Sequence, residues 1–201
     1  MSEIHVTSRG SGKLDGMPSI NTSTSLNPFC QSKPTEVCHY CYAKRFEWFR
    51  HNIRVCYEKN YRLLAGRLMP YQELPYFDPD ITPMVRLHSF GELANDIHYE
   101  NFCRIAERNP DVLFVLWTKR PNIVERRVES VPENLSLILS IGRLNPTDEY
   151  VKDELSRHPL FTAAYVVGVL ADGFEPCGMK CISCLRCYPP KQGDIIKQLL
   201  H

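Results

Sequence analysis

The most apolar stretch of the chain is VLFVLWT, at residues 112–118. An almost wholly apolar run of this length is typical of a β-strand that is covered on both faces. Shorter runs of similar character follow at residues 135–141 (LSLILSI) and 163–169 (AAYVVGV). The three runs predict neighbouring strands inside one buried sheet.

On both sides of residues 112–118, strand-like and helix-like patterns alternate along the chain. The expected elements are strands at 17–26 and 84–90, and helices at 42–69, 96–108, 122–129 and 148–157. This alternation implies βα units, a parallel sheet and right-handed crossovers. We therefore predict a single α/β domain of about five or six parallel strands, at residues 17–170. A loose N-terminal arm, residues 1–16, would precede it, and a cysteine-rich, metal-binding extension, residues 171–201, would follow.

Composition supports an ordinary globular protein. The chain has 201 residues, of which 43% are hydrophobic and 23% charged, and its net charge is +1. This balance argues against disorder and against a surface given over entirely to nucleic acid or anionic lipid. No apolar run has the length of a membrane span, and the first residues lack the apolar stretch of a signal peptide. We expect a cytoplasmic protein with no membrane partner.

Cysteine usage is the most informative feature of the composition. Nine cysteines are present. An odd number in a reducing compartment favours metal ligands over disulfides. Seven of them form two clusters: Cys30, Cys38 and Cys41, here called the triad, and Cys177, Cys181, Cys184 and Cys187, here called the quartet. Cys56 and Cys103 stand apart, on the apolar faces of predicted helices, where a free cysteine is commonly buried.

The triad offers three thiolates on one loop. Three such ligands can hold three irons of a [4Fe-4S] cluster and leave the fourth iron open to a substrate or cofactor. The alternative is zinc, with His39 or a distant cysteine as fourth ligand.

The quartet has the close spacing of a ferredoxin-type cluster loop. One of its cysteines could instead serve the N-terminal site, as happens between the two clusters of some ferredoxins. Zinc is the alternative here as well, including a zinc ribbon that pairs Cys38 and Cys41 with Cys181 and Cys184.

Polar residues follow several of the predicted strands. In parallel sheets, sites form outside the carboxyl ends of the strands, so Glu92, Lys119 and Ser140 are candidates. Lys119 and the adjacent Arg120 can bind a carboxylate or phosphate, or can be solvated loop charges. Glu92 can equally be a solvated residue at the start of a helix.

The segment NPFCQSKPTEVCHYCYAKRF, residues 27–46, resembles the cluster loop of the radical S-adenosylmethionine (SAM) enzymes. Two residues separate the last two cysteines, and an aromatic residue, Tyr40, precedes the final one. Gly91 and Glu92 stand where that superfamily has a Gly-Gly-Glu-like segment that contacts the methionine amino group. The first spacing departs from the family pattern, with seven residues between Cys30 and Cys38 instead of three.

This resemblance implies a partial TIM-like βα barrel and a triad cluster whose open iron binds SAM. The residues expected around that cofactor are Tyr40, Gly91, Glu92, Lys119 and Ser140. One-electron reduction, by a partner such as flavodoxin or ferredoxin, would cleave SAM and start chemistry on an unknown substrate. The quartet would hold an auxiliary cluster.

The chain also resembles the phage-encoded gene product 88 family. The shared motifs span residues 17–188 and are Cys41-Tyr42-Ala43, the His88 to Glu92 segment, Thr118 to Arg120, Pro132 to Leu135, and a C-terminal cysteine cluster. The family has no known reaction. A rival reading is therefore a non-catalytic phage iron–sulfur or zinc protein that binds a host protein or nucleic acid, or carries electrons.

One segment bears directly on nucleic acid as a partner. Between Lys44 and Arg67 the chain has seven Lys or Arg and two Glu, interleaved with aromatic residues. That composition can bind a nucleic-acid backbone. The simpler interpretation is a helix with an apolar core face and a basic solvent face.

Overall fold

A computed structural model describes the chain except for residues 1–2, 8–11, 128, 170–176, 179 and 201. Parts of the expected arm and of the C-terminal extension lie among these undescribed residues. The described part contains a seven-stranded sheet in the order β1-β2-β3-β4-β5-β6-β7. The strands are β1 (Val6–Thr7), β2 (Ser19–Ile20), β3 (Met84–Leu87), β4 (Leu113–Thr118), β5 (Leu135–Leu144), β6 (Ala163–Gly168) and β7 (Asp194–Leu199).

The sheet is mostly parallel, as predicted. Strands β2 to β7 pair in parallel, each with the next strand along the chain, and only β1 runs antiparallel, against β2. A parallel sheet built in sequential order places its crossovers on one face. The described sheet is open, with β1 and β7 at its two edges.

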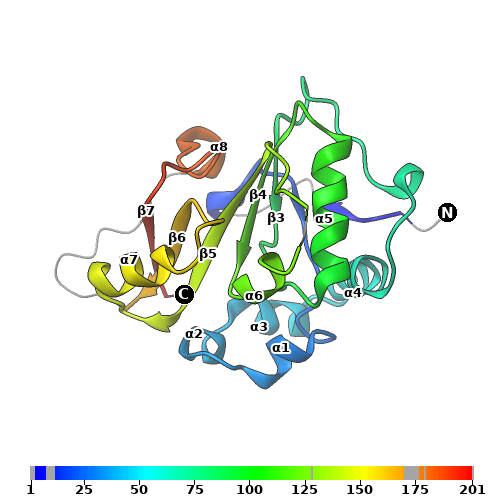
Figure 1. Ribbon diagram of the computed structural model, residues 1–201. Helices are drawn as coiled ribbons and strands as arrows, with labels where there is room; N and C mark the ends of the chain where they lie inside the picture. The colour runs from blue at the N-terminus through cyan, green and yellow to red at the C-terminus, as the bar shows by residue number, and fades with distance from the viewer. Residues whose placement is uncertain (1–2, 8–11, 128, 170–176, 179, 201) are drawn as a thin grey trace.

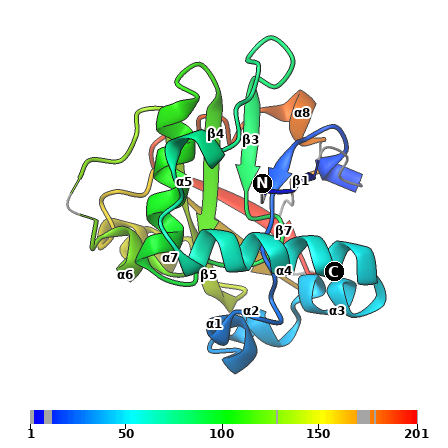
Figure 2. The ribbon, with the colours of Figure 1, turned by 90° about the vertical axis from the view of Figure 1, so that its right-hand side faces the viewer.

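Helices of the crossovers cover one face of the sheet (Figures 1 and 2). The described helices are α1 (Pro28–Ser32), α2 (Glu36–His39), α3 (Tyr42–Phe49), α4 (His51–Gly66), α5 (Asp96–Arg108), α6 (Pro121–Val124), α7 (Asp148–Ser156) and α8 (Cys181–Cys184), with 3-10 turns η1 (Gly12–Leu14) and η2 (Tyr71–Glu73). Side chains from α4, α5, α6 and α7 share one core with the sheet. None of these helices is long and apolar enough to cross a membrane.

Strand β4 shows how the apolar run is used. Phe114 and Leu116 face the main core under the helices, whereas Val115 and Trp117 face a smaller cluster on the opposite side. Side chains alternate between the two faces of a strand, so a run that is apolar throughout must be covered twice. The second cover comes from the N- and C-terminal segments, including Met17 and Tyr188.

Both terminal segments are more integrated than expected. In the described part of the arm, Ile4 is buried, β1 pairs with β2, and the His5 amide donates a hydrogen bond to Asn60 Oδ1 (2.8 Å). At the other end, β7 pairs with β6 over its whole length and so adds a strand to the predicted domain. Neither β1 nor β7 has an apolar pattern, alternating or continuous, that is long enough to predict a strand from the sequence.

The helix expected over residues 42–69 is divided in two. Arg50, at the junction of α3 and α4, has φ −120° and ψ 80°, which is outside the helical region. The break lets α3 turn toward the carboxyl ends of the strands while α4 packs on α5. The apolar pattern of residues 42–69 continues across Arg50, so periodicity alone could not reveal the break between α3 and α4.

Candidate functional site: a cysteine-lined pocket at the strand ends

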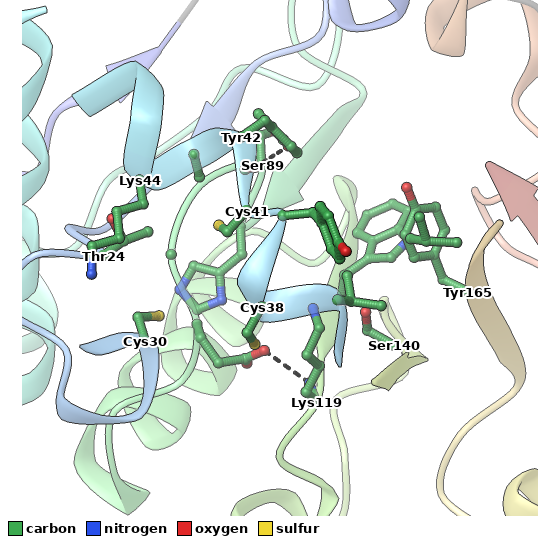
Figure 3. Close-up of a pocket in the computed structure, with 18 of the residues that line it drawn as sticks. Thr24, Cys30, Cys38, Cys41, Tyr42, Lys44, Ser89, Lys119, Ser140 and Tyr165 are labelled. Atoms are coloured by element: carbon green, nitrogen blue, oxygen red, sulfur yellow. Dashed lines mark hydrogen bonds between the residues drawn. The ribbon is translucent and has the colours of Figure 1, made fainter. Parts of the chain in front are cut away.

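A large pocket lies over the carboxyl halves of the parallel strands (Figure 3). It is a partly open hollow, and its empty space of about 1050 Å³ includes open solvent. Its lining includes the three triad cysteines and all five residues predicted to surround a cofactor: Tyr40, Gly91, Glu92, Lys119 and Ser140. Residues that are distant in the sequence therefore meet at one site.

The triad loop crosses the strand ends and is fixed at both sides. At its start, Asn27 caps α1 by accepting from the Phe29 amide (3.0 Å), and its Nδ2 donates to the Glu92 carbonyl (2.7 Å). Further along, Glu36 Oε2 accepts from the Leu144 amide (2.9 Å) at the end of β5. These bonds hold the loop as a cover over the pocket.

Burial and neighbouring charges act on the first triad thiol, Cys30. Burial raises the pKa of Cys30 well above that of an ordinary thiol, and the charges of Glu92, Cys41 and Cys38 raise it further. Cys38 also accepts a hydrogen bond from Thr35 Oγ1 (3.1 Å). To bind a metal here, the cysteines must lose their thiol protons. The metal cation would then balance the negative charge of the thiolates.

Glu92 is a buried carboxylate at the centre of the site. Its Oε1 accepts from the Leu93 amide (2.8 Å) and from Thr118 Oγ1 (2.5 Å), and its Oε2 accepts from the Lys119 amide (2.9 Å). It thereby joins the loop after β3 to the end of β4. A carboxylate has about four acceptor positions, so Oε2 keeps capacity for a further donor in the pocket.

Gly91 makes the close approach of two strand ends feasible. Its φ is +98°, a left-handed conformation, and a Cβ there would lie 2.3 Å from Thr22 Oγ1. The same junction is held by Asn21, whose Oδ1 accepts from the amides of Ser89 (2.8 Å) and Phe90 (3.0 Å). The pocket edge after β3 is thus tied to the strand that precedes the triad.

The wall formed by the sheet is positively charged and aromatic. Arg86 and Lys119 line it together with Trp117, Tyr165 and Ser140. The pocket's acid, Glu92, is already bonded to backbone and to a hydroxyl, so cations exceed accessible acids at this wall. Arg86 is not among the predicted site residues, although a charged residue inside the apolar strand expected at 84–90 is a signal.

Three buried polar atoms among the residues lining the pocket lack a hydrogen-bond partner within the described chain: Thr24 Oγ1, His88 Nδ1 and Ser89 Oγ. Leaving such groups unpaired is costly, so a bound water or ligand is the usual partner. Burial, His98 and Arg86 lower the pKa of His88 well below the ordinary value, so its imidazole is neutral near pH 7.

Helix α8, which carries Cys181 and Cys184, lies far from α1 and α2 in both views (Figures 1 and 2), whereas the Cys177 amide donates to the Lys197 carbonyl (2.8 Å) in β7. Cys181 and Cys187 pack against the apolar cluster on the second face, next to Met84 at the start of β3. Burial raises the pKa of Cys187 to about 12. No quartet cysteine is among the described residues that line the pocket.

In the described structure, neither the triad nor the quartet is arranged to hold a single metal ion. Among the described residues, no three His, Cys, Asp or Glu side chains are placed to hold one metal ion. Ligands of one zinc ion lie about 2.3 Å from it and hence close to each other. The triad places three thiols around one pocket, a donor set that soft metals and iron–sulfur clusters both use.

Most of the chain is similar to a known protein family. The model of the gene product 88 family matches residues 6–169. This range includes the triad and the whole β3 to β6 wall, but it ends before the quartet, although the family motifs predicted from the sequence include a C-terminal cysteine cluster. No curated protein and no solved structure gives a match. Since the matched range is well over half of the 201 residues, the chain belongs to the phage gene product 88 family.

Proposed function

We propose that this protein is a radical-SAM-like iron–sulfur enzyme whose triad holds a [4Fe-4S] cluster with one open iron. The observation that carries the proposal is the pocket itself, where the triad and the five expected cofactor residues share one cavity. The sequential order of the six parallel strands supports it further, because a βα barrel is wound in that order.

Cys30, Cys38 and Cys41 would hold the cluster, and the neighbouring residues would hold SAM. With both groups bound, the site would supply one-electron reductive cleavage of SAM, the electron coming from a reductant such as flavodoxin or ferredoxin. The free acceptor position of Glu92 Oε2 suits the methionine ammonium group. Lys119 suits the methionine carboxylate, and exposed Tyr40 supplies an aromatic surface at the pocket mouth.

A positive wall also serves this role electrostatically. A cluster with three thiolates is anionic, and Arg86 and Lys119 would stabilise that charge in a partly water-excluded site. The quartet would form a second metal site, an iron–sulfur cluster or zinc, beyond the range that the family model matches.

The test is electron paramagnetic resonance of anaerobically reconstituted, dithionite-reduced protein, with and without SAM. We expect a reduced-cluster signal that changes shape when SAM is added. The Cys38→Ser variant should lose that response, whereas Cys184→Ser should keep it. A cluster signal indifferent to SAM would leave an electron carrier or a structural iron–sulfur protein. A protein that takes up zinc and no iron would favour the non-catalytic binding role.

A further inference from the structure

The exposed side of α3 carries large aromatic residues that the fold does not use. Trp48 is 78% exposed and Phe49 is 70% exposed. Tryptophan is highly buried on average, so two adjacent exposed aromatic residues at a helix end call for a partner. Figure 2 shows α3 at the periphery of the molecule, next to the start of α4.

Cations accompany these aromatic residues. Arg45 and Arg50 are both exposed. Arg45 makes no ion pair with the described residues, and the guanidinium carbon of Arg50 lies 5.7 Å from the centre of the Phe46 ring. Between residues 37 and 57 the acidic side chain is Glu47, which is fully buried and bonded to Ser23 and to the Thr24 amide. The exposed charge along this segment is therefore positive throughout.

The same helix leads into the pocket. Lys44 lines the pocket, and Trp48 follows it by four residues, on the same side of α3. The two positions are about 6 Å apart along the helix axis. Arg45 stands in the same relation to Phe49. Cations and aromatic rings thus form a continuous stripe, Lys44, Arg45, Trp48, Phe49 and Arg50, that ends at the pocket mouth.

We propose that this stripe binds single-stranded nucleic acid and guides a nucleotide toward the pocket. Aromatic faces stack on unpaired bases of any sequence, while arginine and lysine neutralise the phosphates. A duplex keeps its bases stacked internally and cannot use exposed rings in this way. The charge along the stripe selects a polyanion over a neutral protein surface. The nucleic acid's role as substrate rests on the proposed function, but its binding does not.

The test is fluorescence anisotropy of reconstituted full-length protein with labelled oligothymidylate and oligouridylate. Trp48→Ala should weaken binding about tenfold or more, the usual effect of losing one stacking residue. Tyr76→Ala removes an aromatic residue that is 68% exposed elsewhere and should leave the affinity unchanged. Arg45→Ala should weaken binding and reduce the slope of log affinity against log salt by about 0.7, whereas Arg143→Ala should change neither.

Equal affinities of wild type and Trp48→Ala would overturn the proposal, and so would the absence of binding to both oligonucleotides. It would also be overturned if the stripe bound phosphatidylserine vesicles, or drove dimerisation in sedimentation velocity, without binding either oligonucleotide. A difference between the two probes would tell RNA from DNA. Oligonucleotide binding by a protein whose cluster ignores SAM would refute the enzyme and keep this inference; a SAM response without oligonucleotide binding would do the reverse.

Discussion

The guanidinium carbon of Arg86 lies 3.8 Å from the centre of the Trp117 ring, between the pocket and the quartet. Its Nε donates to the His88 carbonyl (3.3 Å), and no described carboxylate pairs with it. Its positive charge lowers the pKa of both Cys181 and Cys187, against the larger effect of burial, which raises them. Arg86 therefore lines the pocket and also influences the quartet thiols through its charge.

Replacing this cation should be felt by the quartet thiols. In reduced, metal-free Arg86→Met protein, we expect the pKa of Cys187 to rise above its present value of about 12. Alkylation of Cys187 at one alkaline pH should slow about two- to tenfold, because the thiolate is the reactive form. Mass spectrometry of iodoacetamide-treated protein measures the rate. Arg143→Met, which removes an exposed arginine stacked on Tyr150, is the control and should not change it.

The Glu92 carboxylate should contribute to stability as well as to the site. In Glu92→Gln an NH₂ group replaces one carboxylate oxygen, so a donor faces a donor in at least one of the three hydrogen bonds. The free energy of unfolding should therefore fall by about 1–3 kcal/mol. Urea denaturation at neutral pH measures this. Glu36→Gln alters an exposed carboxylate that accepts from one amide, and its effect should be clearly smaller. Equal losses in the two variants would contradict a central role for Glu92.

Gly91 should tolerate no side chain. Gly91→Ala puts a Cβ against Thr22 in a left-handed conformation, and we expect a loss of about 2 kcal/mol or more, seen as a lower melting temperature. Gly66→Ala is the matched control, because a Cβ at Gly66, the last residue of α4, meets nothing within 4 Å. A Gly91→Ala protein as stable as Gly66→Ala would show that the loop after β3 can shift.

Acid should destabilise the protein through His98. Burial lowers the pKa of His98 to about 3, whereas in the unfolded chain it is near 6.5. Between these values the unfolded state binds the extra proton, so stability present above pH 6.5 is lost as the pH falls, by about 1.4 kcal/mol per pH unit.

A variant isolates this contribution. His98→Asn can keep an acceptor for the Ala94 amide, which donates to His98 Nδ1, and it removes the titrating group. Urea denaturation at pH 7.5 and pH 5 should show a smaller difference for His98→Asn than for the wild type. His51→Asn, at an exposed position, should retain the wild-type difference. An unchanged pH dependence in His98→Asn would exclude His98 as the cause.

Local patterns predicted those elements whose signal lies within a few consecutive residues. Helix α5 has the predicted bounds, because Asn95 caps it and its buried residues recur at helical spacing. The apolar runs at β4, β5 and β6 identified the centre of the sheet, since strands covered on both faces have no polar side. Strands β1 and β7 were missed, because each is defined by its pairing partner.

For the site, the clustering of cysteines is evident from the sequence, since three and four thiols on short loops are neighbours through chain connectivity alone. The meeting of Glu92, Lys119 and Ser140 with the triad in one pocket depends on the three-dimensional fold, because parallel pairing brings the ends of β3, β4 and β5 to the same edge. The fold also placed α8, which carries Cys181 and Cys184, apart from the triad loop, and it exposed Trp48, which helical periodicity would equally have allowed in the core. Which side of a helix or strand is covered depends on the neighbours that fold against it, and the linear sequence does not contain their positions.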